Sequence, residues 1–348
     1  MKNTPATMKD IARVLNISIA TVSRALREMP EIHIDTRRAV MRVAEELDYQ
    51  PNQLAKNLVK SRTRTIGVIV PNLSYYFFSA LLNSIEEAAM QTGYSVLVCQ
   101  SNESSLREKT HVQNLIRSQV EGFIISLPGD TSNCEHVERL VRRNAPLVLV
   151  DRHTDTLEAF KVIVDNYDAS FKATNHLIEN GCKRIACLAG PPQLLISNQR
   201  IAGYKAALTS HGLPATDEYI LHCDYTQEST IMQAIRLMNL TTPPDGLLTI
   251  SDRIAYSAMY ALKQKNTRIP DDLKVASFNN EPFSAWLSPT LTSVNQPIQQ
   301  MGVEAVRLLL MQIDSGDTVL HPQTTVMNTQ LIIRESSVRT QLPYRVAA

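Results

Sequence analysis

The sequence predicts an α/β protein in which a small all-α head, carrying a helix-turn-helix, is joined by a hinge helix to a body of two doubly wound parallel-sheet subdomains. Three observations support this fold class. Apolar residues recur at helical spacing through the first 50 residues, a basic linker follows, and apolar runs then alternate with amphipathic stretches from residue 66 onward. We expect the head at 1–50, the hinge and linker at 51–64, and a body of two interleaved lobes with a cleft between them at 65–340.

The head begins with two short helices separated by a tight turn. Thr7 and Asp10 form a capping-box-like helix start, Asn16 interrupts the first helical run, and Ser18 caps the second helix. A third helix at 37–47 closes a small core. The exposed residues of the second helix are small or hydrogen-bonding, which suits close approach to the major groove of DNA. The candidates for DNA contact are Ser18, Ile19, Ala20, Thr21, Ser23 and Arg24. A generic three-helix packing module is the alternative.

A short helix is expected in the linker. Pro51 suits the first helical position, but so short a helix is marginal in water and should form only when it is docked. Leu58 has no core to enter, and beside basic residues it could wedge between base pairs in the minor groove. The alternative is a plain linker with an incidental leucine.

The net charge divides unevenly along the chain. The total is +1, which taken alone argues against nucleic acid as a partner. Residues 1–64, however, hold 12 basic and 7 acidic side chains (+5), whereas the remaining 284 residues hold 23 and 27 (−4). A basic head on a mildly acidic body suggests that the head binds nucleic acid.

Composition excludes several other classes. Five cysteines with no CxxC spacing favour reduced thiols in a cytoplasmic protein over a disulfide framework. No apolar run reaches the 18 residues of a membrane span, and the first residues lack the apolar core of a signal peptide. No glycine-rich phosphate loop, nucleophile elbow or metal-ligand spacing is present. We therefore expect no membrane partner, no cofactor, no metal and no enzymatic activity.

The alternation of apolar and amphipathic stretches predicts that the body consists of repeated βαβ units. Strands are expected at 66–70, 95–99, 123–126 and 147–150, with helices at 78–92, 106–118 and 134–143. A second series begins near Ala169, with strands at 185–189, 246–250 and 275–278. In open parallel sheets, ligands bind beyond the carboxyl ends of the strands.

Aromatic and polar residues gather at those strand ends. Rings that present a flat face, together with groups that can make bidentate hydrogen bonds, are what a polyhydroxyl ligand needs, and a nucleobase would use the same groups. The candidates are Tyr76, Phe77, Phe78, Asp151, Arg152, Arg200, Asp252, Asn279 and Gln296. The structural alternatives are a core role for Phe77 or Phe78, a surface ion pair for Arg200, and a helix cap for Asp252.

Several motifs, in order along the chain, resemble the lactose/galactose-repressor (LacI/GalR) family of bacterial transcription regulators. In the head these are Met8-Lys9-Asp10-Ile11-Ala12, Ser18-Ile19-Ala20-Thr21-Val22-Ser23-Arg24-Ala25-Leu26 and Tyr49-Gln50-Pro51-Asn52. In the body they include Val150-Asp151-Arg152, Arg200-Ile201-Ala202-Gly203-Tyr204, Ser251-Asp252 and Leu291-Thr292-Ser293-Val294-Asn295-Gln296-Pro297. The resemblance spans about residues 7–335. It departs at Ser277-Phe278-Asn279, where many relatives carry Gly-Phe-Asp.

The resemblance implies a body like that of periplasmic binding proteins and adds Asn52 to the DNA contacts and Tyr225 to the effector contacts. It also implies a homodimer that binds a pseudo-palindromic operator and is switched by a small molecule, with a sugar or sugar derivative as the first expectation. The alternatives are a nucleobase-responsive repressor of the same architecture, a sugar-binding receptor, and an enzyme on the same body.

Overall fold

The computed structural model describes residues 6–49, 62–131, 134–316 and 318–338. The chain divides into two compact units, Met1–Thr63 and Arg64–Ala348, which we describe separately. The expected hinge helix, with Asn52 and Leu58, lies outside the described residues.

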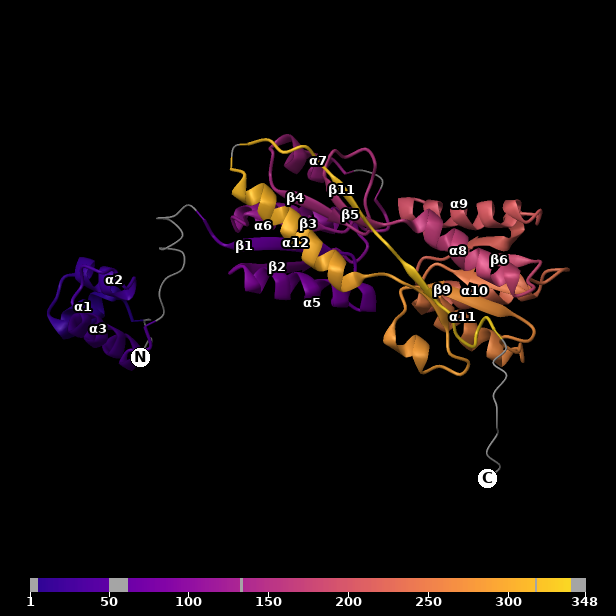
Figure 1. The fold of residues 1–348 in the computed structure, drawn as a ribbon, viewed down its shortest axis with the longest axis horizontal. Helices are drawn as coiled ribbons and strands as arrows, with labels where there is room; N and C mark the ends of the chain where they lie inside the picture. The colour runs from indigo at the N-terminus through magenta and orange to yellow at the C-terminus, as the bar shows by residue number, and fades with distance from the viewer. Residues whose placement is uncertain (1–5, 50–61, 132–133, 317, 339–348) are drawn as a thin grey trace, which may run out of the picture. The chain divides into compact units, whose positions relative to one another are not determined.

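The first unit is a three-helix module, drawn in indigo in Figure 1. Its helices are α1 (Met8–Leu15), α2 (Ile19–Leu26) and α3 (Ile34–Glu46), and each packs against the other two. The third helix begins three residues earlier than predicted, because His33 caps it. A small apolar core of Ile11, Ala12, Val22, Ala25, Val40 and Val43 holds the module together.

Local hydrogen bonds fix the turn between the first two helices. The Thr7 amide donates to the Asp10 carboxylate at 3.0 Å, as the capping-box pattern predicts. Asn16 adopts the left-handed conformation that ends α1 (φ 51°), and the Ser18 hydroxyl accepts from the Thr21 amide at 3.0 Å. The predicted helix-turn-helix is confirmed.

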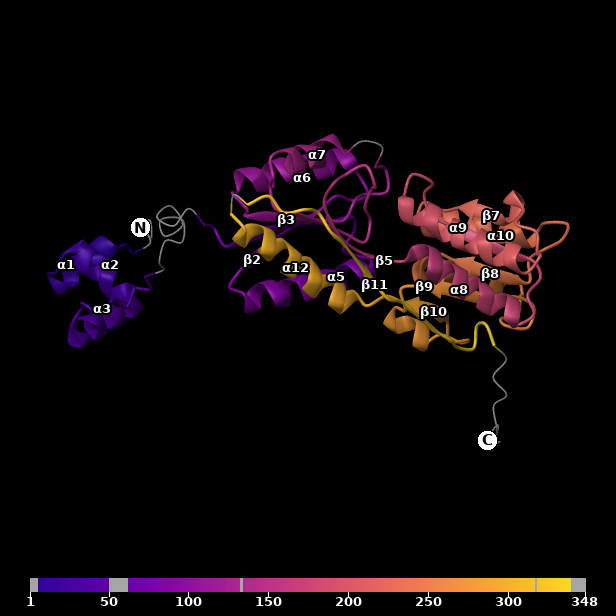
Figure 2. The same ribbon diagram turned by 45° about the horizontal axis from the view of Figure 1, so that its top comes forward.

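The second unit contains two sheets of six strands, each the centre of one lobe. Lobe 1 has the order β11-β5-β4-β3-β1-β2, and all of its strand pairs are parallel. Helices α5 and α12 cover one face and α6 and α7 the other (Figures 1 and 2). The elements of lobe 1 are β1 (Thr65–Val70), α5 (Tyr76–Gln91), β2 (Ser95–Gln100), α6 (Ser105–Arg117), β3 (Gly122–Ile125), α7 (Glu135–Arg142), β4 (Leu147–Val150), β5 (Phe160–Val164), α12 (Ile298–Asp314) and β11 (Thr324–Met327).

Lobe 2 repeats this plan with one difference. Its order is β12-β10-β9-β8-β6-β7, and the edge strand β12 runs antiparallel to β10, so this sheet is not wholly parallel as expected. Helix α8 packs against α9, and α10 packs against α11. The elements of lobe 2 are α8 (Asn166–Glu179), β6 (Ile185–Ala189), α9 (Leu195–Ser210), the 3-10 helix η1 (Asp217–Tyr219), β7 (Ile220–His222), α10 (Gln227–Met238), β8 (Gly246–Thr249), α11 (Asp252–Gln264), β9 (Lys274–Phe278), the 3-10 helix η2 (Pro282–Ala285), β10 (Thr292–Asn295) and β12 (Gln330–Ile332).

The chain passes between the lobes three times: from β5 to α8, from β10 to α12, and from β11 to β12. As a result, α12 and β11 complete lobe 1 although they follow most of lobe 2 in the sequence (yellow and orange in Figure 1). The predicted fold class of two doubly wound subdomains is confirmed. The sequence pattern had not identified β5, β7, β10, β11 or β12.

Candidate functional site

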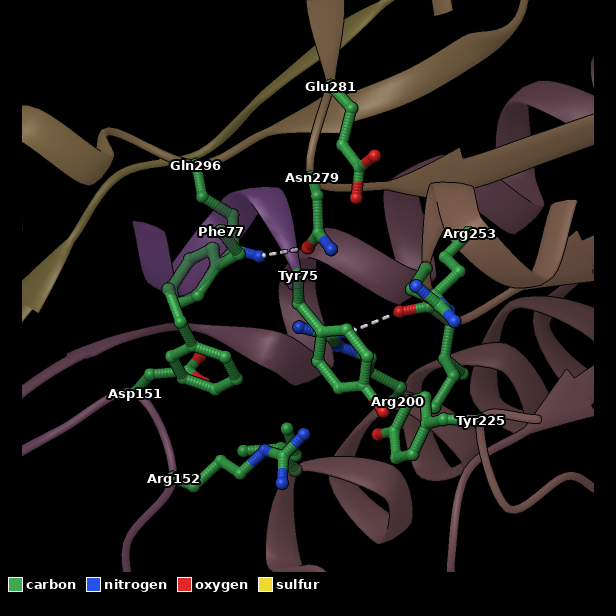
Figure 3. A pocket seen from close by; sticks show the side chains of 14 residues that line it. Tyr75, Phe77, Asp151, Arg152, Arg200, Tyr225, Arg253, Asn279, Glu281 and Gln296 are labelled. Atoms are coloured by element: carbon green, nitrogen blue, oxygen red, sulfur yellow. Dashed lines mark hydrogen bonds between the residues drawn. The ribbon is translucent and has the colours of Figure 1, made fainter. Parts of the chain in front are cut away.

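A cavity lies between the lobes, at the carboxyl ends of their strands (Figure 3). Lobe 1 supplies residues that follow β1 and β4, and lobe 2 supplies residues that follow β6, β7, β8, β9 and β10. This is where ligands bind in open parallel sheets. The lining comprises Tyr75, Phe77, Phe78, Asp151, Arg152, Ile196, Arg200, Tyr225, Ile250, Ser251, Arg253, Asn279, Glu281 and Gln296.

Aromatic rings form one wall of the cavity. Tyr75 of lobe 1 and Tyr225 of lobe 2 contact each other with ring centroids 6.1 Å apart and ring planes tilted by 42°, and Tyr75 lies 6.4 Å from Phe78. Phe77 meets Phe78 edge to face at 5.2 Å. Tyr225 has a positive φ of 67°, a conformation that few non-glycine residues adopt. The rings are therefore available to a flat ligand surface from both lobes.

Arg152 sits at the centre of the charged part of the cavity. Its guanidinium lies over the rings of Phe78 and Tyr225, 5.2 and 5.3 Å from the centroids. Its Nη1 donates to Glu103 Oε2 at 2.6 Å, and the same oxygen accepts from the Gly129 amide at 2.7 Å. The other carboxylate oxygen of Glu103 is buried without a hydrogen-bond partner among the described residues.

Asp151 brings a carboxylate to the cavity from a strained position, with φ at 59°. Its side chain is buried beside the charges of Arg152 and Arg200. Burial raises the pKa of Asp151, and the neighbouring charges of Arg152 and Arg200 oppose that rise. A ligand that donates hydrogen bonds would stabilise the charged form of this carboxylate.

Arg200 is held rigidly by lobe 2. Its Nε donates to Asn166 Oδ1 at 2.8 Å and its Nη1 to the Ile250 carbonyl at 2.5 Å, while its plane lies 4.2 Å from the Phe278 centroid. Burial lowers the pKa of Arg200, and the charge of Asp151 counteracts this. The expected alternative, a surface ion pair, is wrong because the side chain is buried and lines the cavity.

Asn279 and Gln296 close the cavity from lobe 2. Gln296 Nε2 donates to Asn279 Oδ1 at 2.8 Å, the contact marked in Figure 3. Gln296 Oε1 is buried without a partner in the part of the chain that the structure describes. Asn279, which directly follows β9, has a φ of 104°. The cavity therefore contains polar oxygens that are ready to accept hydrogen bonds.

Two residues from the predicted set do not line the cavity. Asp252 is fully buried and turned away from it, because its carboxylate accepts from the Glu281 amide (2.8 Å), Ser284 Oγ (2.7 Å) and Ser293 Oγ (2.6 Å). Tyr76 lies on a different face of α5, in a groove shared with α12. These two side chains therefore lie outside the cavity lining in this structure, and their contact with a ligand stays a prediction.

Sequence reasoning missed six lining residues, namely Tyr75, Ile196, Ile250, Ser251, Arg253 and Glu281. Arg253 lies over the Tyr75 ring at 5.0 Å and so connects the two lobes. Burial raises the pKa of Glu281 to about 7; the Asp252 charge adds to this rise and Arg253 opposes it. Their closeness in sequence to Tyr76, Asp252 and Asn279 was the only signal that could have found Tyr75, Arg253 and Glu281.

The cavity is small as it stands. Its unfilled space, including the part open to solvent, is about 460 Å³, but water-sized molecules could occupy only about 40 Å³ of it. That smaller volume has room for a few waters and not for a sugar ring. A ligand of that size can enter only if the lobes or the lining side chains move.

In the first unit, α2 presents the predicted DNA-contacting surface. Ser18, Ile19, Ala20 and Arg24 are exposed, with Ile19 at 43% despite its apolar side chain. Thr21 is half-buried, and its hydroxyl hydrogen-bonds with that of Ser18 at 2.8 Å, so it supports the helix cap. Ser23 is also half-buried.

The described residues contain no group of three or more His, Cys, Asp or Glu side chains that could hold a metal ion. Among the helices described, none has the length and apolar character needed to cross a membrane.

Comparisons with known proteins match both units. Residues 7–52 match the family of bacterial regulatory proteins of the lacI type, and residues 174–337 match the periplasmic binding protein-like domain. The HTH-type transcriptional repressor CytR of Escherichia coli (strain K12) is 34% identical over 339 residues, which are 97% of each chain. The structure of the Lac repressor dimer bound to operator and the anti-inducer ONPF is similar, with a TM-score of 0.85 and 27% identity over 96% of this chain and 100% of that one. A complex of the transcriptional regulator CelR with cellobiose has a TM-score of 0.73 and 26% identity, over 95% and 99%.

Proposed function

The chain belongs to the lacI family of bacterial regulatory proteins, and from that premise we propose that it is a transcriptional repressor whose operator binding is switched by a small molecule. One observation carries the proposal. A single chain combines a basic head that exposes a capped helix with a body whose interlobe cavity is lined by buried charged and aromatic groups. In this proposal the head recognises the operator sequence, and the cavity binds the small molecule that changes operator affinity.

In this proposal α2 enters the major groove. Ile19 and Ala20 contact base edges, while Ser18, Ser23 and Arg24 reach bases or phosphates, because these residues lie on or near the exposed side of the helix. Asn52 and Leu58 are proposed to act in the minor groove. Repression takes place in the cytoplasm, where bacterial DNA is found.

The cavity is proposed to take a sugar or sugar derivative. Gln296 Oε1 lines the cavity without a hydrogen-bond partner among the described residues, and the buried Asp151 carboxylate lines it beside two arginines, so a ligand rich in hydroxyl donors would have acceptors there. The aromatic wall that contains Tyr75, Phe78 and Tyr225 favours a second candidate, a nucleobase or nucleoside, which would stack on one of these rings.

A homodimer is proposed because apolar surface remains uncovered on both lobes. In lobe 1 the groove between α5 and α12, of about 750 Å³, contains Tyr76 and the exposed Val303. In lobe 2, Tyr260, Phe283 and Trp286 are exposed, Trp286 at 74%. Large exposed aromatic patches mark interaction sites, and a two-fold dimer would present two heads to a pseudo-palindromic operator.

Control is proposed to act through the angle between the lobes. Because the cavity as it stands is too small for a sugar ring, the ligand-bound arrangement must differ from this one. A ligand that binds one arrangement more tightly shifts the population towards it, and so changes how the two heads reach DNA.

The test uses the full chain. An operator is selected from a random duplex library, and sugars, sugar phosphates and nucleosides are screened by thermal shift. The proposal expects a compound that raises the Tm, is not turned over, and changes operator affinity in fluorescence anisotropy. Gln296→Leu should abolish the thermal shift, while Gln264→Leu, an exposed glutamine at the end of α11, should retain it. Turnover of the compound, or a shift that leaves DNA affinity unchanged, would overturn the proposal.

A further inference from the structure

Helices α6 and α7 cover the face of lobe 1 opposite α5 and α12 (Figures 1 and 2), and residues of both helices line a groove. It consists of two adjoining hollows of about 260 and 180 Å³ that share Lys109, His136 and Arg139. We propose that this α6–α7 groove docks an acidic, amphipathic segment of a partner protein. The inference is independent of the DNA and effector sites proposed above.

Positive charge is concentrated in the groove. Lys109, Arg117, Arg139 and Arg143 line the larger hollow, which contains no carboxylate in its lining, and all four are exposed. Of the four, Arg139 alone forms an ion pair among the described residues, with Glu135 at 2.5 Å. Since residues 65–348 carry a net charge of −4, this group of cations stands out from the rest of the body. It would attract an anionic partner.

Apolar side chains form the floor of the groove. Val112 and Leu140 are buried beneath it, while Ile116 in the larger hollow and Leu106 in the smaller are 42% and 71% exposed. A DNA backbone would present nothing apolar to these residues. An amphipathic protein segment would place its apolar side chains on them and its carboxylates against the surrounding cations.

A buried pair holds the two helices together under the groove. His136 Nε2 lies 2.6 Å from Glu108 Oε1, and both side chains are buried. Glu108 Oε2 has no hydrogen-bond partner in the described part of the chain. Because this contact joins α6 to α7 directly, the groove is formed in advance, which lowers the conformational cost of binding.

The chain itself does not supply the occupant. The stretches outside the described residues hold one acidic side chain, Asp317, and the longer ones are basic: 50–61 carries Lys56 and Lys60, and 339–348 carries Arg339 and Arg345. None of these stretches could therefore serve as the acidic segment, and we assign the occupant to another protein.

The test is a peptide titration of the full chain by fluorescence anisotropy at physiological salt. The probe is a labelled two-heptad peptide of the repeat Glu-Glu-Leu-Leu-Glu-Glu-Leu, with poly-glutamate of equal length as the charge-only comparison. The groove variant is Lys109→Ala/Arg117→Ala/Arg143→Ala. The control variant, Arg236→Ala/Lys263→Ala/Lys265→Ala, removes the same charge from exposed positions of lobe 2.

We expect the amphipathic peptide to bind the native chain and the groove variant to lose at least about tenfold in affinity, while the control variant stays within about twofold. Unchanged operator affinity and Tm would show that the groove variant is folded. Equal loss in both variants, or poly-glutamate binding as tightly as the amphipathic peptide, would overturn the proposal. So would a sedimentation result in which the groove variant alone stops self-associating, because a second copy would then be the occupant.

Discussion

Replacing Asp252 by alanine should destabilise the body without removing any side chain from the cavity. The substitution leaves three buried donors without their acceptor: the Glu281 amide, Ser284 Oγ and Ser293 Oγ. Each hydrogen bond to a charged group contributes about 1.5–3 kcal/mol. Ser284 keeps Tyr256 as a partner, at 2.9 Å between the hydroxyl oxygens, so the total is reduced. We expect a loss of about 3–5 kcal/mol in the free energy of unfolding.

The assay is urea unfolding of the full chain, monitored by far-UV circular dichroism, because the only tryptophan, Trp286, is already 74% exposed in the folded state. The effector affinity should also fall, since the displaced loop carries Glu281. Glu218→Ala, an exposed carboxylate elsewhere in lobe 2, is the control and should change stability by less than about 0.5 kcal/mol. A loss below about 1 kcal/mol for Asp252→Ala would refute the argument that this carboxylate organises the site.

Three further predictions follow from single residues. Gly203→Ala should lower the free energy of unfolding in urea by more than about 2 kcal/mol, because the added Cβ would lie 2.1 Å from the Tyr167 carbonyl oxygen where α8 meets α9. An unchanged free energy of unfolding would mean that the two helices separate easily. Arg24→Ala should weaken operator binding by about 1–3 kcal/mol in anisotropy titrations, and an unchanged affinity would remove Arg24 from the interface. The pKa of Glu281 is about 7 in the folded state and 4.5 in the unfolded state, so between these values the folded chain holds a proton that the unfolded chain has released. The Tm should therefore fall as pH rises from about 5 to 7. Glu281→Gln should flatten that dependence, and an unaltered profile in the variant would contradict the assignment.

Local sequence signals predicted the head well because its structure is determined locally. The Thr7 and Ser18 caps, the Asn16 turn and the apolar spacing each act within one or two helical turns, and the structure reproduces them. The start of α3 was misplaced because histidine is a weak cap signal, and no favoured cap residue stands at position 33.

The directions of the site side chains depend on tertiary contacts, which the sequence pattern does not predict. Tyr75, the N-cap of α5, and Phe78 in its first turn both line the cavity, whereas Tyr76 lies in the groove shared with α12. That assignment depends on the helix starting at Tyr76, two residues before the start at 78 that the sequence predicted. Similarly, the sequence placed Asp252 at the correct strand end, but the positions of Ser284 and Ser293 determine which way its carboxylate points.

The interleaved course of the chain also affects how the protein is made. The apolar face of lobe 1 is closed by Ile298, Met301, Ala305 and Leu309 of α12, and its last strand, β11, ends at Met327. During synthesis, a ribosome must therefore produce most of the 348 residues before the first lobe can bury that face. Until then the sheet of lobe 1 presents an uncovered apolar surface to other nascent chains and to chaperones. A transcript that ended before residue 298 would yield a head attached to a lobe that cannot complete its core.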